Sequence, residues 1–351
     1  MIHSTLRSAC VALALTAIVP DACPIKVHTL GDSTMADYDP SATVTRGWGM
    51  YVSQFLTGGA TAVNYARGGR DSRQGYTELW TKMAKPAVEA GDYVIIQFAH
   101  NDEKNNGMDG VALYNYYDGI GYEVSASAVD QRGTVPATTY KEYLGLIATE
   151  ALNLGAHPIF VAPVCRSYFT DGVIRRNGRH DLGDSYKVLT ADGPADGTPL
   201  TADDHTMDYA YQMKVLAEEM YLPFIDPTTA TRDLYESYGP AKCEPMLFDG
   251  AGSTHFNSTG ATLAARLCMQ LLREQGILTD YISLTTDLCV SPAQADLGEV
   301  YKGQILIKEF TLSGFDMEPA DGSIRIEPPA GIGIVRRRLS DGRVETLKIR
   351  K

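Results

Sequence analysis

The sequence predicts an α/β protein with a doubly wound, mostly parallel sheet of five strands and a small β-rich module at the C-terminus. Three observations predict this fold. Short apolar runs alternate with longer stretches of helical spacing between residues 24 and 278. The apolar residues of those runs are mostly unbroken, as in parallel strands buried on both faces. From about residue 283 the helical period disappears, and glycines separate short segments that alternate in the manner of strands.

Composition and charge narrow the class of protein. The 351 residues are 44% hydrophobic and 21% charged, which is ordinary globular usage and long enough for one large domain with a smaller companion. The formal net charge of -12 argues against a nucleic-acid partner, because phosphate binding needs a basic surface. No internal apolar run approaches the roughly 20 residues that a transmembrane helix requires.

The first residues resemble an export signal. Arg7 follows a short polar start, and Ala9 to Pro20 is almost wholly apolar. We therefore expect residues 1–22 to be a signal peptide and the protein to be periplasmic, cell-surface or extracellular; an N-terminal strand or buried helix is the alternative.

The six cysteines do not settle the compartment. No CxxC pair or Cys/His cluster has the spacing of a structural zinc site. The sequence allows one disulfide but does not show which cysteines would form it. Cys268 is expected to be a small buried hydrophobic residue on a helix.

The elements follow in order within a main domain expected at residues 24–282. The expected strands are Ile25–Leu30, Thr61–Tyr65, Asp92–Phe98, Pro158–Pro163 and Pro223–Ile225. Helical spacing from Tyr140 to Ala151 predicts a helix that stops at Gly155, and a second is expected between an Asn257 cap and Gly276. Residues 283–351 form the β-rich module, beginning with Ile305 to Leu312. So few strands bury little surface, so the module must pack on the main domain or be incomplete.

Polar residues follow each of the first three strands, where ligands sit in a parallel sheet. They are Gly31-Asp32-Ser33, Gly68-Gly69 and His100-Asn101, and we expect the three turns to converge. His255 directly precedes the last long helix. One hydroxyl, one imidazole and several neutral N–H donors meet the needs of acyl transfer.

Four ordered blocks then carry a family resemblance: GDSTMADY, NYARGGRDSR, FAHND and STHFNSTGA. From about residue 26 to 278 the chain resembles the SGNH (GDSL-type) hydrolases, which have a flavodoxin-like α/β/α fold. The nearest branch is the rhamnogalacturonan acetylesterases of carbohydrate esterase family 12. The resemblance implies Ser33 as nucleophile, His255 as general base, and an oxyanion hole of the Ser33 and Gly69 N–H groups with the Asn101 side chain. It also implies that no metal or organic cofactor is required.

Two positions depart from the family pattern. Ala99 replaces the glycine that usually begins the third block, a small change because the donor is Asn101. Gly252 stands where the acidic partner of the histidine normally lies, three residues before it. The nearest carboxylate is Asp249, which we expect to fold back onto His255. Otherwise a backbone carbonyl orients the ring, or the protein is a weak catalyst.

The substrate side is expected in a long loop from Asn105 to Thr138. Its Tyr114, Tyr116, Tyr117 and Tyr122 stack on sugar rings or simply pack the loop. Arg70, Arg73 and Arg132 recognise a uronate carboxylate, or form structural ion pairs with acids such as Asp71 and Asp102. Polar clusters at His180-Asp181 and Asp203-Asp204-His205 are explained by loop polarity, although a metal there is conceivable.

These features together predict an exported serine esterase that deacetylates plant cell-wall polysaccharide, most specifically rhamnogalacturonan or pectin. The first alternative is an esterase of acetylated xylan or simple esters. The second is a catalytically weak carbohydrate-binding homologue, which is suggested by Gly252 at the position of the acidic residue. An acidic protein needs locally positive residues to bind an anionic pectin, which draws attention to Arg70, Arg73 and Arg132.

Overall fold

A computed structural model describes residues 24–122 and 129–284 together with four C-terminal strands at 317–320, 323–326, 332–338 and 344–350. Internal contacts divide the chain into two compact units, Met1–Thr286 and Asp287–Lys351. The N-terminal unit contains the residues that the sequence assigns to the chemistry.

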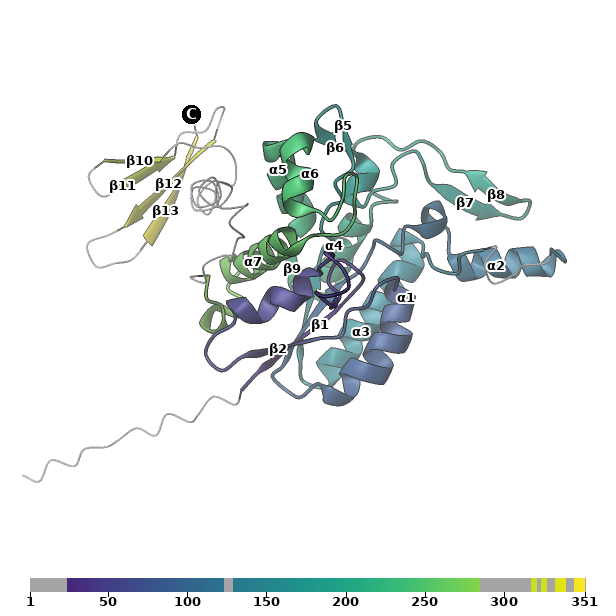
Figure 1. Ribbon diagram of the computed structural model, residues 1–351, viewed down its shortest axis with the longest axis horizontal. Helices are drawn as coiled ribbons and strands as arrows, with labels where there is room; N and C mark the ends of the chain where they lie inside the picture. Colours follow the sequence, from purple (N-terminus) through teal and green to yellow (C-terminus); the bar gives the residue numbers. More distant parts are fainter. Residues whose placement is uncertain are drawn as a thin grey trace, which may run out of the picture. The chain divides into compact units, whose positions relative to one another are not determined.

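A five-stranded sheet forms the centre of the first unit (Figure 1). Its strands are β1 (Lys26–Gly31), β2 (Thr61–Asn64), β3 (Tyr93–Gln97), β4 (His157–Val161) and β9 (Phe224–Ile225). They lie in the order β2-β1-β3-β4-β9, and every neighbouring pair is parallel. The predicted α/β fold with a parallel five-stranded sheet is confirmed, and all carboxyl ends of the strands share one edge.

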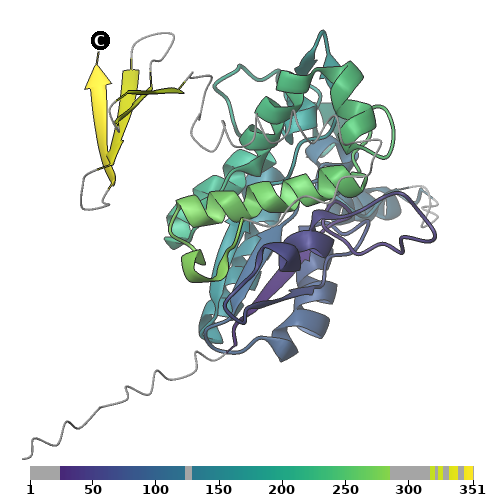
Figure 2. The same cartoon turned by 60° about the vertical axis from the view of Figure 1, so that its left-hand side comes forward.

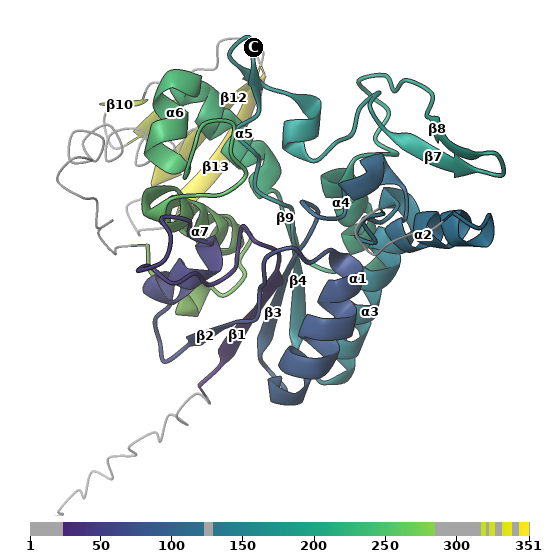
Figure 3. The same ribbon diagram turned by 45° about the vertical axis from the view of Figure 1, so that its right-hand side comes forward.

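Helices cover both faces of the sheet (Figure 3). On one face lie α1 (Ser72–Gln74), η2 (Gly75–Ala84), η3 (Lys85–Ala87), α3 (Lys141–Asn153) and α4 (Tyr209–Met220). On the other, α7 (Ser258–Glu274) runs alongside η1 (Trp48–Phe55), as the long green helix and the purple segment of Figure 2 show. The remaining helices are η4 (Lys104–Gly107), α2 (Gly110–Gly119), η5 (Pro136–Tyr140), η6 (Arg176–Arg179), α5 (Pro227–Tyr238), α6 (Pro240–Leu247) and η7 (Thr279–Tyr281).

The two helices predicted from spacing and end signals are confirmed as α3 and α7. Gly155 follows α3 with a φ of +78°, a left-handed conformation in which a side chain is strained. Asn257 caps α7 by accepting a hydrogen bond from the Gly260 N–H at 3.1 Å. Cys268 is buried on α7, as expected.

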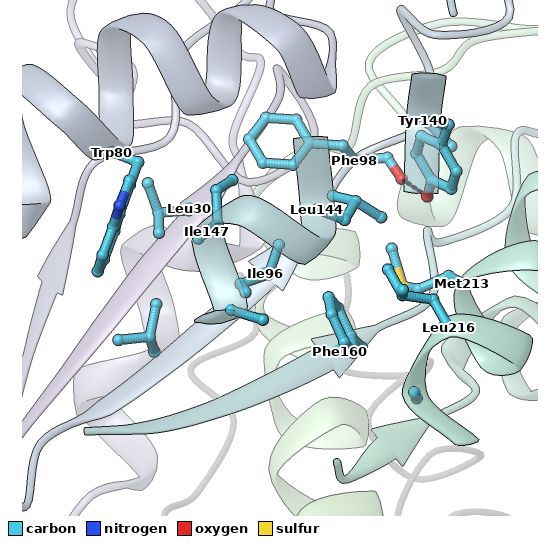
Figure 4. Close-up of a cluster of buried hydrophobic side chains, with 14 of the residues drawn as sticks. Leu30, Trp80, Ile96, Phe98, Tyr140, Leu144, Ile147, Phe160, Met213 and Leu216 are labelled. Atoms are coloured by element: carbon cyan, nitrogen blue, oxygen red, sulfur yellow. Dashed lines mark hydrogen bonds between the residues drawn. The ribbon is translucent and has the colours of Figure 1, made fainter. Parts of the chain in front are cut away.

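Large side chains fill the space between the sheet and α3, η2 and α4 (Figure 4). Trp80 and Tyr140 are fully buried, and the polar atom of each side chain makes a hydrogen bond. The Trp80 Nε1–H donates to Glu150 Oε2 at 2.7 Å, and the Tyr140 hydroxyl donates to the Phe98 carbonyl at 2.7 Å. This core holds the β3 strand whose following turn carries Asn101.

The segment from Asn105 to Thr138 is not one long loop, which corrects the sequence-based expectation. It contains α2, whose first turn is capped by Asp109 accepting from the Val111 and Ala112 N–H groups at 3.0 and 2.9 Å. Leu113 anchors the helix in a small cluster with Met108 and Val129. Only Gly110 and Leu113 of α2 are buried, which is too weak a pattern to show the helix in the sequence.

Two short hairpins complete the described part of the first unit: β5 (Phe169–Thr170) with β6 (Val173–Ile174), and β7 (Lys187–Thr190) with β8 (Gly193–Asp196). Figures 1 and 3 show the β7–β8 hairpin beside α2. Leu189 of β7 packs against the cluster that anchors α2.

The second unit contains an antiparallel sheet of β10 (Met317–Ala320), β11 (Ser323–Ile326), β12 (Ile332–Arg338) and β13 (Val344–Arg350), in that order. The strand expected at Ile305 to Leu312 and the signal peptide expected at residues 1–22 lie outside the described residues. Among the described helices, none is long and apolar enough to cross a membrane.

Two leucines of α3 provide a matched test of this core. Leu144 is fully buried, whereas Leu146 is 37% exposed on the same helix. We predict that Leu144→Ala lowers the free energy of unfolding by about 2–5 kcal/mol, because it leaves a cavity. Leu146→Ala should cost less than about 1 kcal/mol. Denaturant unfolding monitored by circular dichroism measures both, and equal losses would contradict the packing described.

Candidate active site

Ser33 and His255 meet at the carboxyl edge of the sheet. Ser33 lies in the turn directly after β1, and its Oγ is 2.9 Å from His255 Nε2. Asn257, two residues further on, is fixed by donating from its Nδ2 to the carbonyls of Met246 and Phe248 at 3.0 and 3.1 Å. The start of α7 is thereby anchored, and it presents the imidazole to the hydroxyl.

A buried carboxylate shapes the turn that carries Ser33. Asp32 accepts from the Thr34 N–H at 2.9 Å and from the Thr34 hydroxyl at 2.8 Å. Its other oxygen lies 2.7 Å from His100 Nδ1. Burial alone would raise the pKa of Asp32, but His100 and the bonds from Thr34 together lower it to about 2. Asp32 is therefore an ionised, fully satisfied acceptor.

A second layer of buried polar groups lies behind His100. The centroids of the His180 and His100 rings lie 4.2 Å apart, with the rings edge to face. His180 Nδ1 is 2.7 Å from Glu103 Oε1. Arg166 pairs with Glu103 and donates to the His100 carbonyl at 2.9 Å. His180, which the sequence placed in a polar loop cluster, thus belongs to the support of the turn after β3.

Three N–H donors lie on the turns that follow β1, β2 and β3. The Gly68-Gly69 turn after β2 lies against Ser33, because a side-chain carbon at Gly68 would be 3.7 Å from the Ser33 Cβ. Among the described residues, neither the Ser33 nor the Gly69 backbone N–H donates to another group. Asn101 is 7% exposed and gives one Nδ2 hydrogen to the Arg70 carbonyl at 3.1 Å, which leaves its second hydrogen for a ligand. The predicted convergence of the three turns is confirmed.

Asp249 does not reach the imidazole, contrary to expectation. One carboxylate oxygen accepts from the Thr45 hydroxyl at 2.6 Å, and the other accepts from the Ser253 hydroxyl. Among the hydrogen bonds of the described residues, none joins Asp249 to the His255 ring. The glycine-rich loop does fold back, but the backbone makes the contact: the Asp249 N–H donates to the His255 carbonyl at 3.0 Å.

The His255 loop is instead held by hydrogen bonds around it. The Ser253 hydroxyl, fixed by Asp249, accepts from the His255 N–H at 3.0 Å. The Ser253 carbonyl accepts from the N–H and the hydroxyl of Ser167, both at 3.0 Å. Asp249 therefore positions His255 through Ser253 rather than through the ring.

Tyr38 is a site residue that the sequence reasoning missed. Its hydroxyl donates to the Ser33 carbonyl at 2.9 Å. Burial and the charges of Asp32 and Asp249 raise the pKa of Tyr38 to about 12, so the hydroxyl remains a donor. Its place in the GDSTMADY block, five residues after Ser33, is the signal that marks it.

The three arginines singled out in the sequence have different surroundings. Arg73 pairs with Asp109, lies 4.0 Å from Asp71 and is 15% exposed, which is the environment of a structural ion pair. Arg70 pairs with Glu78 at 3.0 Å and is one-third exposed. Arg132 is also one-third exposed, pairs with Asp130, and donates from NH1 to Asn101 Oδ1 at 3.3 Å. Arg132 therefore contacts the site itself.

The predicted tyrosines belong to α2 and its surroundings. Tyr114 and Tyr117 pack on the cluster that anchors α2, and the Tyr117 ring lies 5.6 Å from that of Tyr122. Tyr116 packs against the β7–β8 hairpin, where a side-chain carbon at Gly193 would be 3.0 Å from its hydroxyl. No hydrogen bond or ring contact of the described residues joins these tyrosines to Ser33, His255 or Asn101.

Metal-binding groups do not gather in the described part of the chain: no set of three His, Cys, Asp or Glu side chains there has the arrangement to hold an ion. His205 Nδ1 lies 3.5 Å from Asp208 Oδ2. Cys165, Cys243 and Cys268 are buried free thiols, and Cys10, Cys23 and Cys289 lie outside the described residues.

Comparisons with known proteins agree with this geometry. The model of the GDSL-like lipase/acylhydrolase family matches residues 27–268. Rhamnogalacturonan acetylesterase RhgT of Bacillus subtilis is 30% identical over 74% of this chain and 94% of its own length. The probable rhamnogalacturonan acetylesterase YesY of the same organism is 27% identical over 73% of this chain and 96% of its own. A crystal structure of another B. subtilis protein shares the fold with a TM-score of 0.51 and 21% identity, over 72% of this chain and 57% of that one.

Asp32 generates a pH prediction with a built-in control. The pKa of Asp32 is about 2 in the folded protein, compared with an ordinary value of 3.8. Ionised Asp32 therefore stabilises the fold above about pH 4. That contribution, about 2 kcal/mol, is lost as the pH falls through 2. Burial lowers the pKa of His100 to about 4, so the folded protein takes up this proton later than the unfolded chain and loses stability as the pH falls toward 4. We predict that the free energy of unfolding falls more steeply between pH 5 and pH 2 in the wild type than in the Asp32→Asn/His100→Gln double variant, which has neither group.

The control is Asp39, which accepts from Ser41 N–H and hydroxyl at 2.8 and 2.7 Å in the same way but is exposed. Asp39→Asn should change stability less at every pH. Urea unfolding across this range measures the wild type and both variants, and a double variant with the same pH dependence as the wild type would refute the lowered pKa values of Asp32 and His100.

Proposed function

The chain belongs to the GDSL-like lipase/acylhydrolase family, a family of ester hydrolases, and from that premise we propose a serine esterase that removes acetyl groups from rhamnogalacturonan or a related pectin. The observation that carries the proposal is the 2.9 Å contact between Ser33 Oγ and His255 Nε2, with three N–H donors beside it. A hydroxyl next to an imidazole and a set of fixed donors is the arrangement that acyl transfer requires.

The proposed reaction has two halves. His255 Nε2 takes the Ser33 proton while Oγ attacks the acetyl carbonyl carbon, and the Ser33 N–H, the Gly69 N–H and the Asn101 Nδ2–H hold the tetrahedral oxyanion. The sugar alkoxide leaves with the proton from His255. A water then gives a proton to the same nitrogen and attacks the acetyl-Ser33 ester, which releases acetate and restores the hydroxyl.

Catalysis on this proposal proceeds without a carboxylate on the imidazole. Loss of the acid from a Ser-His-Asp triad lowers turnover by about 10⁴, mainly because the ring takes the wrong orientation or tautomer. Here the loop bonds from Ser253 and Asp249 fix the backbone that carries His255. They replace part of the orienting role, and Asp249 acts as a positioning residue.

The proposed substrate rests on the named relatives and on charge. Both B. subtilis relatives carry rhamnogalacturonan acetylesterase names, one of them as probable. A polysaccharide with uronate groups would meet a protein of net charge -12, so a local cation is needed. Arg70 and Arg132, each one-third exposed, lie next to the oxyanion donors and supply it.

We also propose that the protein is exported, which suits a polymeric substrate outside the cell. The support is the sequence of residues 1–22, with Arg7 before an apolar run. Intact-mass analysis of the full chain expressed in a bacterium should show the loss of this segment. A periplasmic or secreted product that still carries Met1 would contradict a cleaved signal.

The catalytic assignment predicts an ordered set of activities on p-nitrophenyl acetate. Ser33→Ala and His255→Ala should each reduce kcat to background, because one removes the nucleophile and the other its base. Asp249→Asn and Ser253→Ala should each lower kcat by about tenfold to a hundredfold, far less than the 10⁴ of a triad acid. Ser41→Ala, in the exposed neighbouring loop, is the control. Wild-type activity no higher than that of Ser33→Ala would end the esterase proposal.

The substrate prediction is tested by acetate release from acetylated rhamnogalacturonan, acetylated homogalacturonan and acetylated xylan. We expect the highest kcat/KM on rhamnogalacturonan, and we expect Arg70→Met to raise KM on the two uronate polymers but not on xylan. Preference for xylan, or an equal effect of Arg70→Met on all three polymers, would contradict the proposed substrate class.

A further inference from the structure

We propose that Arg132 is a positioning residue that fixes the Asn101 carboxamide, so that its N–H points into the oxyanion hole. This inference rests on the proposed function and adds a residue to its machinery. Arg132 lies far from Asn101 in the sequence, in the segment between α2 and η5, and it donates from NH1 to Asn101 Oδ1 at 3.3 Å.

The contacts of Asn101 select one orientation of its amide. Nδ2 donates to the Arg70 carbonyl at 3.1 Å, while Oδ1 faces the Arg132 guanidinium. A half-turn about the Cβ–Cγ bond would place Oδ1 against that carbonyl and the amide hydrogens against a cation. Both contacts would then be repulsive, since guanidinium has only donors and a carbonyl only accepts. Arg132 therefore decides which end of Asn101 is free to bind an oxyanion.

Arg132 is itself held in place on its other edge. Its Nε and NH2 donate to the Asp130 carboxylate at 2.9 and 2.6 Å, and its backbone N–H donates to the same group at 3.0 Å. The Arg132 carbonyl accepts from Asn105 Nδ2 at 2.8 Å. With one edge of the planar fork paired to Asp130, the NH1 edge is directed at Asn101.

The segment around Arg132 is tied to the turns that form the site. The Gly133 N–H donates to Asp71 at 3.0 Å, and the Thr134 hydroxyl donates to Asp102 at 2.7 Å. Asp71 follows Gly69 in the turn after β2, and Asp102 follows Asn101 after β3. Arg132 is thus carried on a segment that is braced against both turns.

The guanidinium also lies against the second donor of the hole. A side-chain carbon at Gly69 would be 3.5 Å from Arg132 NH1, so the cation borders Gly69 as well as Asn101. Because Arg132 NH1 donates to Asn101, an oxyanion donor, loss of Arg132 should also slow the hydrolysis of neutral esters.

The test is a double-mutant cycle on p-nitrophenyl acetate, which carries no carboxylate. We expect Arg132→Met to lower kcat roughly tenfold with little change in KM, and Asn101→Ala to lower kcat by about 10²–10³. The double variant should be no slower than Asn101→Ala within about twofold, because Arg132 acts through Asn101. An undiminished tenfold effect of Arg132→Met in the Asn101→Ala background would overturn the inference, as would wild-type kcat in Arg132→Met alone.

Two further measurements separate positioning from folding. Arg232 forms the same kind of pair with neighbouring Asp233, at 2.9 and 2.7 Å, so Arg232→Met is the matched control and should keep wild-type kcat and KM. If Arg132→Met fails to fold, Arg132→Lys replaces it in the cycle. A lysine keeps the charge, but its single ammonium replaces the fork that serves both Asp130 and Asn101.

A readout without turnover keeps this inference distinct from the esterase proposal. The side-chain amide signals of Asn101, assigned by their loss in Asn101→Ala, should shift or broaden in ¹⁵N NMR spectra of Arg132→Met and stay unchanged in Arg232→Met. Unchanged Asn101 signals in Arg132→Met would refute the positioning role. Absence of Ser33-dependent hydrolysis in the wild type would refute the proposed function and leave this result standing.

Discussion

The hydrogen bond between Asp32 and His100 joins the two turns on which the site depends. Asp32 precedes Ser33 after β1, and His100 precedes Asn101 after β3, so their 2.7 Å contact fixes the nucleophile relative to an oxyanion donor. Both side chains are almost fully buried, and the remaining oxygen of Asp32 is bonded to Thr34. A buried hydrogen bond to an ionised carboxylate is strong because no water competes for it, and removing His100 would leave the Asp32 charge buried without that partner.

The rest of the site is assembled on that pair from segments that are distant in the chain. The turn after β2 brings Gly69, the start of α7 brings His255, and the segment before η5 brings Arg132. The loop of His255 is held through Ser253, and the segment of Arg132 is held through Asp71 and Asp102. Asp249 illustrates this: its carboxylate holds Thr45 and Ser253, and its effect reaches His255 only through the loop backbone.

Much of this arrangement was predictable from the sequence, because it depends on local patterns. Unbroken apolar runs marked the parallel strands, and polar residues directly after them marked Ser33, Gly69 and Asn101. The role of Asp249 was not predictable, since its partner Thr45 is 204 positions away and sequence spacing does not say which way a side chain points. The α2 helix escaped notice because only Leu113 and Gly110 are buried in it. Arg132 was noticed as a cation, but its contact with Asn101 depends on how its segment packs.

The central claim is that Ser33 carries the acyl group between the two halves of the reaction. Its most direct test is mass spectrometry of the protein mixed with p-nitrophenyl acetate and quenched in acid within the first turnover. The account predicts one acetyl group per chain, located on Ser33 in the peptide that contains GDSTM, and none in Ser33→Ala. Release of p-nitrophenol without a Ser33 adduct, or with acetyl on another residue that is needed for turnover, would contradict it.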